Sequence, residues 1–168
     1  FTACNSVQLE ANSVNFDITY DVIQKNGEDY LQVRMDYPSY DYSWLTSHTD
    51  GTYGMYMGFG YGKDGMIGST AIICGLYYKG KSNDTLYCAE VYFTAEAPAT
   101  TIYNHTGSDE FTWTTNYLEY GANSKANMSV TATRKFKYTN RSDIYEITGG
   151  EMPVIYAEGA IIAGYPQD

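Results

Sequence analysis

The chain has 168 residues, with 10 Lys or Arg against 20 Asp or Glu, which gives a formal net charge of −10. This length predicts one domain, and the acidic balance without a basic cluster argues against nucleic acid or an anionic membrane surface as partner. No apolar run approaches the ~18 residues that a membrane-spanning helix needs.

The first residues predict an extended segment followed by strands. We expect residues 1–12 to form an extended N-terminal segment and residues 13–168 to form the single domain. Because the chain starts at Phe1 rather than Met, we also expect that a preceding segment has been removed. From residue 13, SVNFDITYDVI alternates apolar and polar side chains, which is the period of a half-buried strand. QKNGED then gives an Asn-Gly hairpin signal, and YLQVRMD alternates again.

Further strands are predicted along the rest of the chain. AIICGLYY (71–78) and LYCAEVYF (86–93) form the next predicted hairpin, MSVTATRKF (128–136) alternates, and PVIYAEGAII (153–162) closes the pattern. No segment keeps a helical period for three turns, so we expect an all-β, antiparallel sandwich or barrel of about 9–11 strands. Its expected core contains Val14, Phe16, Ile18, Val33, Ile72 and Val130.

Four Asn-x-Ser/Thr sequons indicate the secretory pathway of a eukaryote. They lie where we expect turns or strand ends, as the attachment of N-linked glycans requires. The acceptors are Asn83, Asn104, Asn127 and Asn140. We therefore expect a secreted glycoprotein, located outside the cell or at the cell surface.

Three cysteines allow three disulfide pairings and leave one thiol over. Cys74 and Cys88 lie symmetrically about residue 81, in the middle of the predicted turn KGKSND. A hairpin centred there places the two cysteines opposite each other, so we expect them to pair. Cys4 is then free or bonds another chain.

Tyrosine is heavily used, at 19 residues. Aromatic residues are good strand formers whose hydroxyls reach the surface, which is the ordinary explanation. The alternative is an aromatic contact surface for a sugar or a protein. The densest exposed-looking cluster is YPSYDYSW (37–44), which places the candidate patch at Tyr37, Tyr40, Tyr42 and Trp44.

The two histidines do not indicate catalysis. His105 lies inside a sequon, and His48, in LTSHTDG, is typical of a loop residue. No Ser-His-Asp or Cys-His set can be assembled from the sequence, and no His or Cys spacing suits zinc. We expect no enzymatic activity.

Several motifs occur in an order that is typical of one family. In GMYMGFGYGKDGMIGSTAII (54–73), a strand ending in Gly-x-Gly precedes a loop with Met66 and then a small polar pair that leads into an apolar strand. MSVTATRKF, SDIYEI and VIYAEGA follow farther on. This order resembles the DOMON family, including plant cytochrome-linked members and the N-terminal domain of dopamine β-hydroxylase. The resemblance covers about residues 13 to 165 and implies a β-sandwich that binds haem or sugar.

In haem-binding members of that family, a Met and a His hold the iron. Met66 matches the position of the Met, and the His should follow the final strand. The stretch IIAGYPQD contains no histidine there. Methionine alone is a weak axial ligand, so we expect no bound cofactor, and haem b with Met66 as an axial ligand is the minor alternative.

These observations leave three candidate functions. The first is a non-catalytic extracellular subunit, structural, self-assembling or adhesive, whose partners are other copies of itself or cell-surface and extracellular proteins. The second is a module that binds a carbohydrate or another small ligand. The third is a b-type haem domain for electron transfer. We expect the first.

Overall fold

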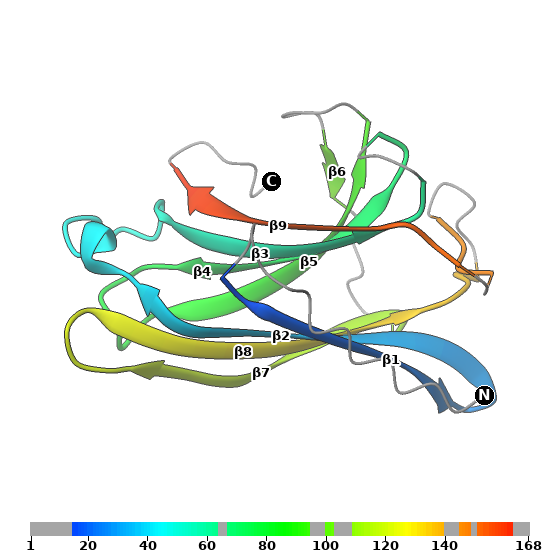
Figure 1. The fold of residues 1–168 in the computed structure, drawn as a ribbon, viewed down its shortest axis with the longest axis horizontal. Coiled ribbons are helices and arrows are strands. Elements are labelled where there is room, and N and C mark those ends of the chain that lie inside the picture. Colours follow the sequence, from blue (N-terminus) through cyan, green and yellow to red (C-terminus); the bar gives the residue numbers. More distant parts are fainter. Residues whose placement is uncertain are drawn as a thin grey trace.

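The computed structural model describes residues 15–63, 67–94, 100–102, 109–139, 145–148 and 151–162. These residues form nine strands and one short 3-10 turn, η1 (Ser43–Leu45). The strands make two antiparallel sheets stacked face to face (Figure 1). The expected all-β sandwich is therefore confirmed. None of the residues described forms a helix long and apolar enough to span a membrane.

One sheet, here called sheet A, has four strands in the order β1-β2-β8-β7. Their bounds are β1 (Asp17–Lys25), β2 (Glu28–Asp41), β7 (Phe111–Tyr120) and β8 (Lys125–Lys135). Asn26 and Gly27 join β1 to β2 with φ values of 54° and 81°. A two-residue hairpin turn needs positive φ at both positions, which Asn-Gly supplies at little cost. The predicted first hairpin is confirmed.

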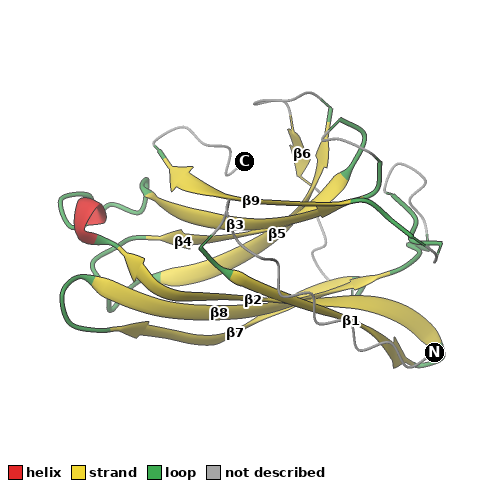
Figure 2. Ribbon diagram, in the orientation of Figure 1, coloured by secondary structure: helices red, strands yellow, loops and turns green. Residues whose placement is uncertain are grey.

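The second sheet, sheet B, has five strands in the order β6-β5-β4-β3-β9. Their bounds are β3 (Gly54–Tyr61), β4 (Thr70–Tyr77), β5 (Thr85–Phe93), β6 (Thr100–Ile102) and β9 (Val154–Ile161). Figure 2 shows that strands and loops make up almost all of the described chain. The register of β4 on β5 pairs Cys74 with Cys88, and a disulfide joins them. The predicted pairing is thus confirmed.

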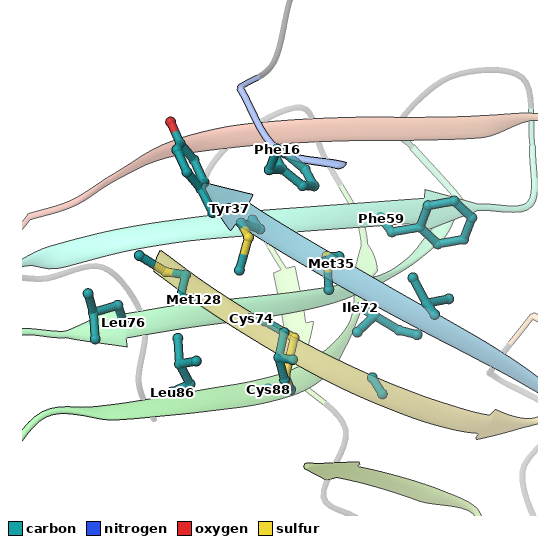
Figure 3. Packing of buried hydrophobic residues seen from close by; sticks show 14 of the residues in the cluster. Phe16, Met35, Tyr37, Phe59, Ile72, Cys74, Leu76, Leu86, Cys88 and Met128 are labelled. Atoms are coloured by element: carbon teal, nitrogen blue, oxygen red, sulfur yellow. A yellow bond between two sulfur atoms is a disulfide. The ribbon is translucent and has the colours of Figure 1, made fainter. Parts of the chain in front are cut away.

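The core fills the space between the two sheets (Figure 3). Five of the six residues expected there are buried: Phe16, Ile18, Val33, Ile72 and Val130. The sixth, Val14, lies outside the part that the structure describes. Successive side chains of a strand point to opposite faces, so each strand contributes every second residue to this core. Flexible thioethers fill much of its middle, from Met35, Met55, Met57 and Met128.

Candidate functional site

A buried ion pair links the two sheets near one end of the sandwich. Glu90 of β5 and Arg134 of β8 have fully buried side chains, and Arg134 Nε donates to Glu90 Oε1 at 2.7 Å. The Tyr61 hydroxyl donates to the same oxygen at 2.7 Å, and the Tyr138 hydroxyl donates to Glu90 Oε2. Arg134 also donates to the backbone carbonyls of Phe136 and Tyr145. The pair therefore satisfies its polar atoms inside the protein.

The electrostatics of this group favour the charged pair and neutral phenols. Burial, and next the charge of Glu90, hold the pKa of Tyr61 well above its usual value, and the same two causes raise the pKa of Tyr138. Burial alone would lower the pKa of Arg134, but the surrounding Tyr61, Glu90 and Tyr138 raise it. Because neither Glu90 nor Arg134 reaches solvent, the group can hold the sheets together but cannot exchange protons with a substrate.

The sequence indicates this ion pair, although the pattern of apolar residues alone does not reveal it. Glu90 falls on the inward positions of β5, together with Leu86 and Cys88. Arg134 falls on the inward positions of β8, together with Val130 and Ala132. One acid and one base at core positions of different strands predict that the two meet, because an unpaired buried charge is costly.

Met66 lies outside the described residues, but both ends of its loop are visible. The Lys63 backbone N–H donates to Ser69 Oγ at 3.1 Å, and that hydroxyl donates to the Lys63 carbonyl oxygen at 3.2 Å, which closes the base of the loop. Directly inside this end of the sandwich lie Tyr61, Thr70 and the buried ion pair, all without solvent exposure.

The described histidine does not complement Met66. His48 stacks on Tyr53 with ring centroids 3.9 Å apart, next to the start of β3. The loop of Met66 leaves the opposite end of that strand, after Tyr61. An eight-residue strand is roughly 26 Å long, so His48 lies far from Tyr61, after which this loop begins. His105 lies outside the described residues.

The predicted aromatic patch is wrong for two of its four residues. Tyr37 and Tyr42 are buried in the core, whereas Tyr40 is half-buried and Trp44 is exposed, with its Nε1 donating to the Tyr40 hydroxyl at 2.9 Å. Tyr37 keeps the inward parity of Val33 and Met35, before the register of β2 on β8 shifts between Tyr37 and Tyr40. The extra residue then turns Tyr40 and Tyr42 to the same inner side.

Two of the four predicted glycan acceptors lie in the part of the chain that the structure covers. Asn83 is exposed in the turn between β4 and β5, and Asn127 is exposed near the start of β8. Asn127 Oδ1 accepts the Ser39 backbone N–H at 2.9 Å, which leaves its Nδ2, the atom that carries a glycan, uncommitted by that bond. Asn104, Asn140 and Cys4 lie outside the described residues.

The outward face of sheet B is the most unusual surface in the described structure. The strand registers place 16 side-chain positions of β3, β4, β5 and β9 on this face. They are Gly54, Tyr56, Gly58, Gly60, Ala71, Ile73, Gly75, Tyr77, Thr85, Tyr87, Ala89, Val91, Ile155, Ala157, Gly159 and Ile161. None is Asp, Glu, Lys or Arg. Two of these positions, Thr85 and Tyr87, are exposed, seven are half-buried and seven are buried. No described element forms a third layer over it (Figure 1).

The outward face of sheet A has the opposite character. Arg34 and Asp36 form an ion pair on it at 2.8 Å, and the Tyr117 hydroxyl donates to Asp36 at 3.2 Å. Threonines and other polar side chains surround this pair, such as Asn116, which donates to Ser129 Oγ at 2.8 Å. Sheet A thus has the polar outer face of an ordinary solvated sheet, and sheet B does not.

The sequence also indicates that the outward face of sheet B is apolar. GMYMGFGY and TAIICGLY carry no charged residue on either face of the strand, so apolar and polar residues do not alternate along them. Continuous apolar strands are typical of sheets covered on both faces. The sequences of β3 and β4 therefore indicate that both faces of sheet B are apolar. Packing in the core accounts only for the inward-facing half of these residues.

An exposed aromatic pair lies where β5 of sheet B approaches β7 of sheet A. Tyr87 is 50% exposed and Trp113 is 36% exposed, and their rings meet edge to face with centroids 5.7 Å apart. Trp113 sits on the inward side of β7, opposite Ala132. It contacts Tyr87 across the open side of the sandwich.

No protein family matches the chain, and searches of curated proteins and of solved structures also found no match. The resemblance to DOMON domains consequently rests on the sequence motifs alone.

Proposed function

We propose that the protein is a non-catalytic, extracellular structural subunit that associates with copies of itself through the outward face of sheet B. The observation that carries this proposal is the absence of any charged residue among the 16 outward positions of β3, β4, β5 and β9. The exposed and half-buried part of this face is apolar, and apolar surface of this kind is typical of interaction sites.

Charge favours a second copy as the occupant of this face. The chain carries a net charge of −10, so two copies repel each other as wholes, and a contact face without charged residues adds no local repulsion. Two copies of the charge-free face meet without burying an unpaired charge, and one surface patch can pair with itself around a two-fold axis. The described glycan acceptors Asn83 and Asn127 lie elsewhere, so their glycans would leave the face open.

A matched pair of lysine substitutions tests this proposal. Ile73→Lys places a charge in the middle of the outward face of sheet B, on a half-buried position. Thr114→Lys places the same charge on the outward face of sheet A. Sedimentation velocity should show that Ile73→Lys is monomeric at concentrations where the wild-type protein and Thr114→Lys associate. Equal association of both variants would contradict the proposal.

A second candidate function is binding of a carbohydrate at Tyr87 and Trp113. Exposed aromatic rings pack against the apolar faces of sugar rings, and this pair is exposed on both members. Isothermal titration of soluble oligosaccharides should then give heat with the wild-type protein and none with Trp113→Ala. Identical titrations of the two proteins would rule this site out.

An adhesive role is a separate possibility, in which the outward face of sheet B binds another extracellular protein. In that case Ile73→Lys would abolish binding to that protein without any change in self-association.

A further inference from the structure

The two sequons that the structure describes lie in different contexts, although both acceptor asparagines are exposed. Residues 83–85 run from the turn after β4 into the first residue of β5. Residues 127–129 lie inside β8, which has β2 on one side and β7 on the other (Figure 1). An oligosaccharyltransferase must bind both the asparagine amide and the hydroxyl two residues later. Exposure of the asparagine alone therefore does not make a sequon accessible.

The hydroxyl of the second sequon is buried beneath a hydrogen-bond network. Ser129 has no solvent exposure. Asn116 is the extra residue where the register of β7 on β8 shifts, and its Nδ2 donates to Ser129 Oγ at 2.8 Å. Ser129 also hydrogen-bonds the Asp36 carboxylate. The hydroxyl that the enzyme must bind is therefore covered and already engaged by two partners.

The backbone and the amide of this sequon are engaged as well. Met128 and Ser129 have partners on both β2 and β7 in the register of sheet A. Asn127 Oδ1 accepts the Ser39 backbone N–H at 2.9 Å. Ser39 has a positive φ of 57°, so this bond helps to hold the bulge of β2. Binding to the enzyme requires residues 127–129 to leave the sheet and to break these bonds.

The first sequon is open at both positions that the enzyme must bind. Asn83 is exposed in its turn, and Thr85 is exposed at the end of the ladder between β4 and β5. Asp84, between them, anchors the turn, because its carboxylate accepts from the Lys79 backbone N–H and from the Tyr120 hydroxyl. The sequon does not specify the side chain at this middle position. The turn therefore presents a complete acceptor while the sandwich stays intact.

We propose that Asn127 accepts a glycan only before β8 joins sheet A, whereas Asn83 remains an acceptor in the folded protein. In both transfers the asparagine Nδ2 loses a proton and bonds to the anomeric carbon of a lipid-linked oligosaccharide. The bond from that carbon to the diphosphate oxygen breaks, and the lipid diphosphate leaves. The folded sandwich accommodates the product at Asn127, because this residue is exposed and holds Ser39 through Oδ1 rather than Nδ2.

The proposal orders transfer and folding. Strand β8 lies between β2 and β7, so sheet A closes only after Asn127 has met the enzyme. The hairpin of β1 and β2 is local in sequence and can form earlier. This order rests on the secretory route that the sequons indicate, and it does not depend on contact between copies. Its failure would leave the Ile73→Lys test of self-association unaffected.

Glycosylation in vitro of folded and unfolded chains tests this order. The full chain is made without glycans in bacteria, with its disulfide formed, and is incubated with a purified oligosaccharyltransferase and a lipid-linked oligosaccharide. Val33→Asp with Met35→Asp supplies the unfolded reference, because both positions have no solvent exposure and would bury a charge. Circular dichroism confirms which chains are folded, and mass spectrometry of peptides gives the rate at each sequon.

Asn127 should react more than about a hundredfold faster in the unfolded chain, because opening a central strand costs much of the global free energy of unfolding. The two rates at Asn83 should agree within about threefold, since its turn needs no such opening. Equal rates at Asn127 in both chains would overturn the proposal. So would an Asn83 that reacts only in the unfolded chain, or an Asn127 that reacts in neither.

Met35→Ala provides a second measurement in a folded chain. Met35 is buried at the register position of Val130 in β8, so the cavity should raise the fraction of molecules in which β8 is open. The rate at Asn127 should rise at least about tenfold, and the rate at Asn83 should not change. Val22→Ala, at an exposed position of β1, is the matched control and should change neither rate. An unchanged rate at Asn127 in Met35→Ala would contradict protection by the folded sheet.

Discussion

At the scale of single residues, the buried pair of Glu90 and Arg134 decides how the two sheets meet at one end. Both side chains have no solvent exposure, and Tyr61 and Tyr138 complete the hydrogen bonding of the carboxylate. Such a pair adds little net stability compared with apolar residues, but losing one partner leaves a charge without compensation. We therefore expect the pair to matter more for which strands face each other than for the net stability of the fold.

We expect Arg134→Met to lower the free energy of unfolding by about 3–5 kcal/mol, because Glu90 would remain buried and unpaired. Urea denaturation measures this change. The double variant Glu90→Leu with Arg134→Met should lose less than Arg134→Met alone, since no charge remains. Arg34→Met, which removes the exposed partner of Asp36, is the control and should cost under about 1 kcal/mol. Equal losses in the two arginine variants would contradict the assignment.

Buried tyrosines predict a loss of stability at high pH. Burial, and next the nearby Glu158, raise the pKa of Tyr37 from 10.0 to about 12, and the pKa values of Tyr61 and Tyr138 are also raised. A phenol with a raised pKa stabilises the folded state below its unfolded pKa, and this contribution disappears as the pH rises through the folded pKa. The free energy of unfolding should hold up to about pH 10 and fall between 10 and 12.

Denaturation at a series of pH values, followed by phenolate absorbance and circular dichroism, checks this expectation. Tyr37→Phe should make the decline shallower, because one phenol with a raised pKa is gone. A decline that begins well below pH 10, or a variant with an unchanged slope, would contradict the stated cause.

At the scale of elements, the hairpin of β4 and β5 is held by the disulfide between Cys74 and Cys88, which are separated by 14 residues. Removing it with Cys74→Ala and Cys88→Ala should lower the free energy of unfolding by about 3 kcal/mol, the value expected for a loop of this length. Cys4→Ser is the matched control and should leave stability unchanged. A loss in Cys4→Ser equal to that of the double variant would mean that the pairing is different.

The sequence predicted elements where one simple pattern dominates. Alternation located β1 and the start of β2, the Asn-Gly pair located their turn, and symmetry about residue 81 located the disulfide. The strand β7 gave no such signal, because its central residues are exposed on both sides at the edge of sheet A. The bulge near Ser39 was also invisible, since it depends on the pairing of β2 with β8.

The candidate contact face could be predicted only in part. Apolar runs such as TAIICGLY were recognised as strands, but a run alone does not tell which residues point to the core. That assignment needs the register of β3, β4 and β9, which comes from tertiary structure.

At the scale of the whole molecule, the sandwich has two unlike sides. Sheet A presents ion pairs and threonines to solvent, and the outward positions of β3, β4, β5 and β9 in sheet B carry no charged residue. The chain nevertheless carries a net charge of −10. The charged groups therefore lie on other parts of the described surface, which is the distribution that the proposed contact between copies requires.

The most direct test of self-association is the particle mass of the unmodified protein, measured by light scattering over a concentration series at low and high salt. We predict that the mass rises with concentration above that of one chain. It should rise further at high salt, because salt screens the repulsion between acidic copies and does not weaken an apolar contact. A mass that stays at one chain under every condition would contradict the face contact.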